Sequence, residues 1–348
     1  MTITRRSLLQ GIAATAGLRA AATGIASTPS VAAIAAAVAA ATPVASVRAA
    51  DWPERPVAIV VPFPPGGSND VLGRLFAQHL TERLGQPFVV ENRPGANGNI
   101  GATLVARAKP DGYQLLLSGN GQNAMNHGLF RQMPYDSRRD FTHVIQLASV
   151  PNALAVGSDH PAKSFAQFLE MARKGPQSTF ASPGNGSSGH LAMAMLMVTA
   201  GIALTHIPYK GATPAVTDVV GGQVPIIMVN VDVIKPHVDS GRLRVLAVTG
   251  AERSPLYPDA PTVAESGFPG FSATGWLGLS GPAGMEPGIV ARLHDTLARI
   301  LEEPAVRERA KAGGYELVGG SAERYRAFIA SEIDKWTRVA KETGATLD

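Results

Sequence analysis

The sequence predicts an α/β protein built as two lobes, each with alternating strands and helices. A β-branched apolar run at residues 57–61 is followed by apolar residues at helical spacing from Val71 to Leu84, with Gly85 as a stop signal. Further strand-like runs alternate with helical periodicity up to residue 157, and this alternation is typical of a parallel sheet. The pattern begins again at residue 164, which indicates a second βα sheet.

Composition limits the classes of protein and site. The chain has 348 residues, of which 45% are hydrophobic and 17% charged, values typical of a globular protein with room for two domains. It contains no cysteine, which excludes disulfides, thiolate metal sites and lipid attachment through cysteine. Its eight histidines are scattered, without H-E-x-x-H or another paired metal-ligand spacing. We therefore expect no metal site and no cofactor.

Residues 1–50 are predicted to be an export signal that takes no part in the fold. The pair Arg5-Arg6 precedes a stretch rich in alanine, glycine and leucine, and Val47-Arg48-Ala49 fits a small-x-small cleavage site. We expect a twin-arginine-type signal peptide that is removed near residues 47–51. The alternative is a transmembrane anchor at the apolar run 31–41, but alanine dominates this run and prolines lie close to both its ends.

Removal of residues 1–50 leaves a chain without net charge. The whole sequence has 31 basic and 27 acidic residues, and the four arginines of residues 1–50 account for the difference. The remainder, with 27 basic and 27 acidic residues, lacks the excess of positive charge that nucleic-acid binding requires. The expected product is an exported, periplasmic protein without nucleic acid as a partner.

The order of the predicted elements divides the chain into lobes. Before the pattern repeats we predict a helix at 100–108 and strands at 88–90, 113–117, 141–148 and 153–157. The repeat contains helices at 164–174, 190–199 and 214–220, and strands at 178–181, 204–207, 224–229, 243–249 and 276–280. Two more helices follow at 288–301 and 322–342. Pro151 and the irregular stretch 255–270 are the best crossing points, so lobe 1 is predicted at 51–150 and 273–348 and lobe 2 at 151–272.

The stretch VPFPPGGSND, residues 61–70, predicts a strand end, a tight turn and a helix start. It holds three prolines and the pair Gly66-Gly67. Amide groups at a helix N-terminus can bind an anion, and a residue without a Cβ lets a ligand approach the main chain. An ordinary βα turn explains the stretch equally well. Asp70, in the first helical turn, is as well explained by capping as by contact with a ligand.

A second glycine-rich loop, residues 182–189, also lies between a predicted strand and a predicted helix. Its residues 184–189 match G-x-G-x-x-G, but a dinucleotide site also needs an acidic residue about 20 positions later. No Asp or Glu occurs there before Asp218, so a dinucleotide site is not favoured. The loop still predicts a helix N-terminus suited to a carboxylate or another anion.

Catalytic motifs are weak. Ser187 and Ser188 lie near His190, but this spacing does not make a nucleophile–base pair, and G-x-S-x-G is absent because position 190 is His. Lys210, at a strand end, is either an exposed loop lysine or a charge that faces a cleft. Phe63 and Trp276 are more simply explained as core residues than as platforms for a ligand.

Several motifs occur in an order that resembles one known family. They are VPFPPGGSND (61–70), VVENRPGANGNIGATLVARAKPDGY (89–113), MPYD (133–136), SPGNGSSGHLA (182–192), HIPYKGATPAVTDVVGGQV (206–224), GRLRVLAVTG (241–250) and PDAPTVAESG (258–267). Across essentially the whole chain after the signal, this order is similar to the Bug family of periplasmic solute-binding proteins, the TctC-like component of tripartite tricarboxylate transporters. The resemblance implies a two-lobed type II periplasmic-binding-protein fold with a central ligand cleft, and no catalysis.

The resemblance also implies which residues bind the ligand, largely through main-chain N–H groups and waters. Carried over by position they are Phe63, Pro65, Gly66, Gly67, Ser68, Asn69 and Asp70 in lobe 1, and Ser182, Gly184, Asn185, Gly186, Ser187, Tyr209, Lys210, Gly211 and Asn230 in lobe 2. This chain departs from the family at Pro65, where a small residue is usual. It also has Val229-Asn230 where an Asp-Asn pair is common, with Asp232 displaced.

The function that we expect is capture of a small carboxylate-bearing solute for a tripartite transporter. The amides of Gly66, Gly67, Gly184 and Gly186 are expected to meet the carboxylate without an arginine clamp. The expected partners are the solute and the membrane subunits of the transporter, and the protein is expected to be a monomer. The alternatives are an exported hydrolase or isomerase of small acids, and a ligand sensor for a membrane receptor.

Overall fold

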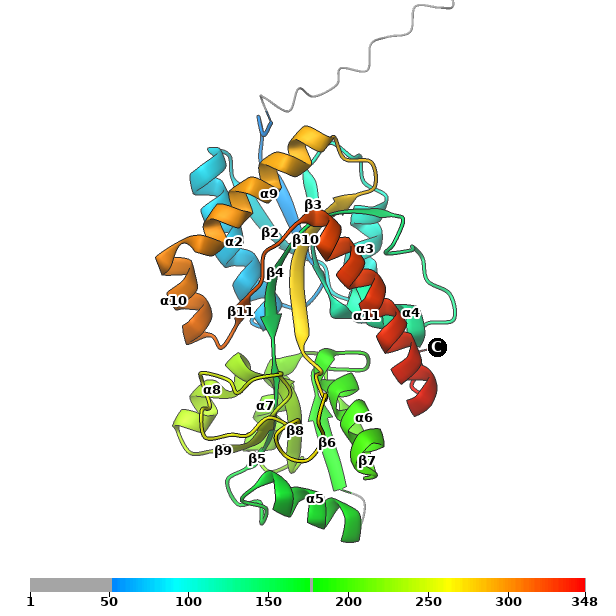
Figure 1. Ribbon diagram of the computed structural model, residues 1–348, viewed down its shortest axis with the longest axis vertical. Coiled ribbons are helices and arrows are strands. Elements are labelled where there is room, and N and C mark those ends of the chain that lie inside the picture. Colours follow the sequence, from blue (N-terminus) through cyan, green and yellow to red (C-terminus); the bar gives the residue numbers. More distant parts are fainter. Residues whose placement is uncertain (1–51, 176–177, 348) are drawn as a thin grey trace, which may run out of the picture. The chain divides into compact units, whose positions relative to one another are not determined.

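The computed structural model describes residues 52–175 and 178–347, and all of them belong to one compact unit (Figure 1). The predicted signal peptide and its cleavage site lie outside these residues. Within them, no helix is both long enough and apolar enough to cross a bilayer.

The first sheet contains strands from both ends of the described chain. Its strand order is β11-β4-β10-β3-β1-β2. The strands are β1 (Val57–Val61), β2 (Phe88–Asn92), β3 (Gln114–Gly119), β4 (Phe141–Val150), β10 (Gly275–Pro282) and β11 (Glu316–Leu317). β1 pairs in parallel with β2 and β3, whereas β10 is antiparallel to both β3 and β4.

The second sheet is formed by the middle of the chain, in the order β7-β6-β8-β5-β9. The strands are β5 (Asn152–Gly157), β6 (Ser178–Ser182), β7 (Leu204–Pro208), β8 (Ile226–Asn230) and β9 (Leu243–Val248). β6 is parallel to β7 and β8, and β5 is antiparallel to β8 and β9. We call the part around the first sheet lobe 1 and the part around the second sheet lobe 2.

The prediction of parallel sheets was wrong for two strands of the first sheet and one of the second. The edge strand β11 is antiparallel to β4. The other two exceptions are the strands that enter from the other lobe: β5 lies reversed between β8 and β9, and β10 lies reversed between β3 and β4. Parallel neighbours need a crossover of a dozen or more residues, usually a helix. Only Pro151 separates β4 from β5, so a strand that crosses directly between lobes has no such crossover.

Helices cover both sheets. Those of lobe 1 are α2 (Ser68–Leu84), α3 (Asn99–Ala106), α4 (Asn126–Leu129), α9 (Pro287–Glu302), α10 (Pro304–Ala312) and α11 (Ala322–Thr343), with a 3₁₀ turn at Ala96–Gly98 and a π-helical turn at Gly121–Met125. Those of lobe 2 are α5 (Phe165–Lys174), α6 (Ser188–Ala200), α7 (Ala212–Val220) and α8 (Val231–Asp239). α8 and α10 were not predicted, because α8 contains Pro236 and α10 buries only two apolar residues.

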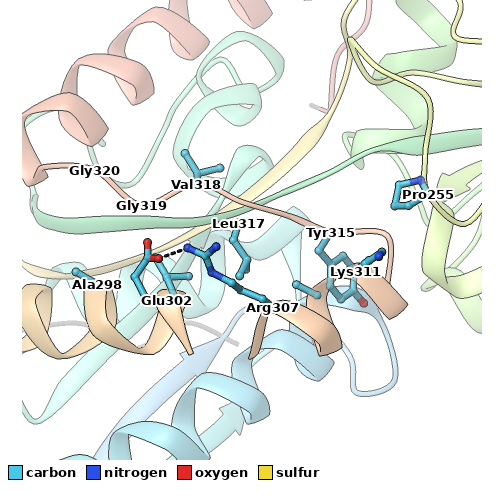
Figure 2. Close-up of a pocket in the computed structure, with 12 residues that line it drawn as sticks. Pro255, Ala298, Glu302, Arg307, Lys311, Tyr315, Leu317, Val318, Gly319 and Gly320 are labelled. Carbon is cyan, nitrogen blue, oxygen red and sulfur yellow. Dashed lines mark hydrogen bonds and ion pairs between the residues drawn. The ribbon is translucent and has the colours of Figure 1, made fainter. Parts of the chain in front are cut away.

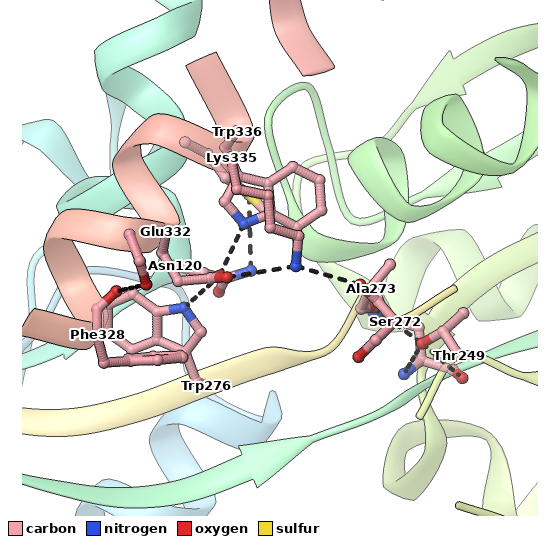
Figure 3. Close-up of polar contacts among 12 residues, drawn as sticks. Asn120, Thr249, Ser272, Ala273, Trp276, Phe328, Glu332, Lys335 and Trp336 are labelled. Atoms are coloured by element: carbon pink, nitrogen blue, oxygen red, sulfur yellow. Dashed lines mark hydrogen bonds and ion pairs between the residues drawn. The ribbon is translucent and has the colours of Figure 1, made fainter. Parts of the chain in front are cut away.

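The C-terminal helix α11 connects lobe 1 to the chain that returns from lobe 2. Figure 3 shows the buried Glu332 of α11, whose Oε2 accepts the indole N–H groups of Trp276 (3.0 Å) and Trp336 (2.8 Å). Lys335 donates to the Ser272 carbonyl oxygen, 3.1 Å away, just before β10. The apolar side of α11 shares one core cluster with α6, so this helix packs against both lobes.

Candidate ligand cleft

A cavity of about 640 Å³ lies between the lobes and is lined by loops of both. Twelve of the residues that the sequence singled out line it: Phe63, Pro65, Gly67, Ser68, Asn69, Gly184, Asn185, Ser187, Tyr209, Lys210, Gly211 and Asn230. Four others, Gly66, Asp70, Ser182 and Gly186, do not line it. The two glycine-rich loops, far apart in the sequence, therefore meet at one site.

Helix N-termini converge on this cavity. In the described part of the chain five helices begin there, and their N-cap residues all line it: Gly67 of α2, Gly98 of α3, Ser187 of α6, Gly211 of α7 and Asn230 of α8. The first amide groups of a helix have no partner within it, and the helix dipole makes this end positive. The cavity is therefore suited to an anion.

The charged side chains around the cavity favour the same conclusion. Among the described residues, Lys210 is the one charged side chain in the lining, and no carboxylate belongs to it. Asp70 and Asp232 occur in the first turns of α2 and α8, but both lie outside the lining. The N-terminal turns of α3, α6 and α7 contain no acid.

Asp70 acts as an anchor of the first loop. It is 5% exposed, and its Oδ2 accepts the amide of Gly66 at 3.2 Å. Arg74, one turn later, approaches Oδ1 to 2.9 Å, and Asn92 donates to the same oxygen at 2.9 Å. Burial raises the pKa of the Asp70 carboxyl, but the hydrogen bonds from Arg74, Asn92 and Gly66 outweigh this and hold the pKa below its usual value. In this structure the carboxylate joins the loop at Gly66 to the first turn of α2, and Asp70 does not line the cavity.

His190 has the corresponding place in the second loop. Its Nδ1 accepts the amide of Gly186 at 3.0 Å, and its own amide donates to the Ser187 hydroxyl at 3.2 Å. The ring stacks on His206 with centroids 4.1 Å apart, and His206 Nε2 lies 2.6 Å from the Ser182 hydroxyl. Burial lowers the pKa of His190 to about 4, and burial together with His190 lowers the pKa of His206 to about 3. Both rings are neutral at pH 7.

Three of the four glycine amides that were expected to meet the carboxylate are engaged elsewhere. Gly66 donates to Asp70, Gly186 to His190, and Gly184 to the Ser182 hydroxyl at 3.2 Å. The amides in a position to meet a ligand are instead those of helix starts that line the cavity, among them 67–69 in α2 and Ser188 in α6. The glycines shape the loops: Gly66, Gly184 and Gly186 all have positive φ, at 89°, 137° and 72°.

The serine–histidine arrangement does not form a catalytic pair. The Ser187 hydroxyl accepts the amide of His190, and the Ser188 hydroxyl donates to Asn152 Oδ1 at 3.1 Å. Ser182 and His206 are close together, but Ser182 is fully buried and neither residue lines the cavity. Across residues 52–175 and 178–347, no cluster of three or more His, Asp or Glu side chains could hold a metal ion.

The sequence reasoning missed part of the lining. The loop 95–98 and the residues Asn120, Gly121 and Thr213 belong to it, as does Trp276, which the sequence had indicated as a core residue and which is indeed buried. The glycine-rich run before residue 99 was a usable signal, because it precedes a predicted helix as the other two loops do. The π-helical turn that contains Gly121 has no comparable signal.

A second hollow, of about 430 Å³, lies away from the cleft between α9, α10 and the chain before α11 (Figure 2). Glu302 and Arg307 form an ion pair in its wall, so opposite charges face each other there. No helix N-cap belongs to its lining among the described residues, which distinguishes this groove from the cleft.

Comparison with known proteins agrees with this geometry. Residues 72–345 match the model of the tripartite tricarboxylate transporter family receptor, TctC. The protein BugT of Bordetella pertussis is 38% identical over 293 residues, which cover 84% of this chain and 90% of BugT.

Solved structures are similar over nearly the same range. A protein of R. palustris, Rpa4515, solved with adipate, has a TM-score of 0.81 and 39% identity, covering 85% of this chain and all of that one. The periplasmic binding protein BugD has a TM-score of 0.79 and 34% identity, covering 85% and 99%. MatC from Rhodopseudomonas palustris, solved with malate, has a TM-score of 0.77 and 31% identity, covering 83% and 99%.

These relatives have the two-lobed fold of periplasmic binding proteins, and they are solute receptors, not enzymes. The expected fold class and the expected absence of catalysis are both confirmed. The chain belongs to the TctC family, the receptors of tripartite tricarboxylate transporters, and its relatives in this family include the Bug proteins.

Proposed function

We propose that this protein captures a small dicarboxylate in the cleft between its lobes. The observation that carries the proposal is the convergence of five helix N-termini on a cavity that has one lysine and no carboxylate in its described lining. Adipate and malate, found in two similar structures, are both dicarboxylates of a size suited to about 640 Å³. The twelve predicted residues that line the cavity, with the loop 95–98, are the proposed binding set.

The wider role follows from the family. We propose that residues 1–50 direct export by the twin-arginine route, and that the remaining chain is a periplasmic monomer which delivers its solute to the membrane subunits of a tripartite transporter. We assign residues 51–150 and 273–348 to lobe 1 and 151–272 to lobe 2, in line with the strand membership of the two sheets. N-terminal sequencing of the secreted protein tests the export step, and a full-length product in the membrane would contradict it.

Calorimetry with adipate, malate and the neutral diamide of adipic acid tests the binding step. We expect a dicarboxylate to bind and the diamide to fail, because only the anion interacts favourably with the helix N-termini and Lys210. A solute at 100 times its dissociation constant adds about 2.7 kcal/mol to the free energy of unfolding, so a thermal-shift screen of other dicarboxylates can precede calorimetry. Equal binding of adipate and its diamide would contradict an anion site.

Lys210→Ala tests how much of the affinity comes from a side-chain charge. A charge-assisted hydrogen bond contributes about 1.5–3 kcal/mol, so we expect a loss of roughly ten- to hundredfold in affinity if Lys210 contacts the solute. Abolished binding would mean that the lysine, and not the main chain, carries recognition.

A further inference from the structure

Asp232 connects the two lobes without lining the cleft. It lies in the first turn of α8 in lobe 2, and both of its carboxylate oxygens accept hydroxyl groups from lobe 1. Ser68, the first residue of α2, donates to Oδ1 at 2.7 Å, and Tyr315, between α10 and β11, donates to Oδ2 at 2.5 Å. We call these three residues the interlobe clasp.

The two lobe 1 residues of the clasp are buried, and Asp232 is partly buried. Ser68 is 4% exposed and Tyr315 is 8% exposed. Burial and the neighbouring Asp232 raise the pKa of the Tyr315 phenol, so its hydroxyl remains a proton donor. Figure 2 shows Tyr315 near Lys311 of α10, at the wall of the groove that extends to Pro255. Separation of the lobes would have to break both hydrogen bonds to the carboxylate.

Ser68 also brings the clasp into contact with the solute site. Its residue lines the cleft and begins α2, while its hydroxyl is directed to Asp232. The Ser68 hydroxyl is therefore already bonded to the other lobe, and the group of Ser68 that remains for a solute is its main-chain amide. Binding of a solute at the N-terminus of α2 therefore depends on the position of Ser68. The clasp depends on the position of the same residue.

We propose that Asp232 and Tyr315 are positioning residues which, through Ser68, hold the lobes together before solute binds. A protein that binds solute only when closed has an apparent affinity reduced by the fraction of molecules that are open. The clasp raises the closed fraction of the empty protein and so raises its affinity. The effect on affinity rests on the proposed function, whereas the closure of the empty protein does not.

Tyr257 provides a matched control within lobe 2. Its hydroxyl donates to the Val231 carbonyl oxygen at 2.8 Å, one residue before Asp232, and it is 7% exposed. Tyr257→Phe thus removes a buried phenol hydroxyl from the same end of α8 without touching an interlobe contact. A role of Tyr315 that is limited to bracing α8 would make the two variants behave alike.

Small-angle scattering of the full mature chain without solute is the primary test. We expect Tyr315→Phe to increase the radius of gyration relative to the unmodified protein, and Tyr257→Phe to leave it unchanged. Asp232→Asn, which removes the charge and one of the two acceptors, should give at least as large an increase. An unchanged radius in Tyr315→Phe, or the same increase in Tyr257→Phe, would overturn the clasp.

Calorimetry with adipate extends the test to the solute site. We expect Tyr315→Phe to weaken binding by about three- to tenfold, the effect of one net hydrogen bond, and saturating adipate to restore the radius of the unmodified protein. If no dicarboxylate binds the unmodified protein, the proposed function fails while the scattering result still decides the clasp. A larger radius in Tyr315→Phe with unchanged affinity would overturn the link between clasp and solute.

Discussion

The loops that precede α2 and α6 are held in the same way, by a side chain that accepts a glycine amide, but the accepting groups differ chemically. In each, a glycine with positive φ precedes the N-cap, and its amide donates to the side chain four residues later. In lobe 1 the acceptor is the Asp70 carboxylate, and in lobe 2 it is the neutral imidazole of His190. The loop needs an acceptor at this position, and a negative charge is only one way to supply it.

The surroundings explain why the charge is tolerated in one lobe only. Asp70 is paired with Arg74, one turn later on α2. The corresponding position on α6 is Ala194, which is buried, so an acid at position 190 would have no cation beside it. Since the stacked rings of His190 and His206 are neutral, the N-terminus of α6 keeps its full positive character. We infer that an anion interacts more favourably with the N-terminus of α6 in lobe 2 than with that of α2 in lobe 1.

The two glycines also differ in what they face. A Cβ built on Gly186 would lie 2.4 Å from Asn97 Nδ2 and 3.0 Å from side-chain atoms of Leu129 and Leu347, all in lobe 1. A Cβ on Gly66 would meet nothing closer than Thr213 Oγ1 of lobe 2, at 3.9 Å. The backbone at Gly186 is therefore packed tightly against the opposite lobe, and the backbone at Gly66 is not.

The largest effect is expected from Gly186→Ala compared with Gly66→Ala. Both replace a glycine with positive φ, so both carry a similar backbone strain of about 1–2 kcal/mol. In Gly186→Ala the overpacking against Asn97 adds about 2 kcal/mol to the closed form, so affinity for adipate should fall about thirtyfold further. Calorimetry, with unfolding curves to measure the shared strain, checks this. Equal losses of affinity in the two variants would show that Gly186 has no special part in closure.

The next largest effect on affinity, about tenfold, is expected when His190 of lobe 2 is replaced by aspartate, the residue that has the corresponding place in lobe 1. His190→Asp retains an acceptor for Gly186 but places an unpaired negative charge at the start of α6, which should weaken adipate binding about tenfold. His190→Asn is the matched control, because it offers a neutral acceptor and should bind nearly as the unmodified protein does. Calorimetry with adipate measures both variants, and unfolding curves show how far the carboxylate, which has no cation beside it, also lowers the stability of His190→Asp. Unimpaired binding by His190→Asp would contradict the inference that an anion interacts more favourably with the N-terminus of α6.

On lowering the pH to 5.5, we expect the contribution of His190 to the free energy of unfolding to fall by about 1 kcal/mol, and that of Asp70 to stay the same. A histidine whose folded pKa lies at about 4, below its usual 6.5, is protonated first in the unfolded state, so its contribution to stability falls as the pH falls from 6.5 to 4. The pKa of Asp70 is lowered from 3.8, so its contribution is present above this pH and declines only below it. Urea unfolding at pH 7.5 and 5.5 should show a smaller loss for His190→Asn than for the unmodified protein, and an unaltered loss for Asp70→Asn. The same loss in all three proteins would rule out His190 as a titrating anchor.

The smallest effect is expected from Asp70→Asn. Because the carboxylate binds the Gly66 amide outside the cleft, its removal should leave adipate binding unchanged or strengthen it by up to about threefold, as a competing negative charge is lost near the helix N-terminus. Calorimetry at neutral pH measures this. A clear loss of affinity would mean that Asp70 contacts the solute or a water that binds it. Asp70 and His190 would then differ in role, although each accepts a glycine amide of its loop.

Local sequence patterns determined the lobes, the two principal loops and their position at helix starts. The runs around Gly66 and Gly186 combine a strand end, a turn and a helix start within about ten residues each, so propensity and periodicity suffice to predict them. The same local reasoning left open whether Asp70 caps α2 or binds a solute. It also assigned the amides of Gly66, Gly184 and Gly186 to the solute, whereas side chains of the same loops accept them.

Only the tertiary structure decided which groups face the cleft and which join the lobes. Asp232 is 164 positions from Ser68 and 83 from Tyr315, and Asn97 donates to the Gly186 carbonyl across 89 positions. Partners this far apart leave no periodicity in the sequence, because their contact depends on how two sheets and their helices are placed together. The sequence by itself determined the local elements of this receptor. The packing of the lobes determined which amides remain open to an anion, since an N–H group already bound to a neighbouring side chain cannot also hold a solute.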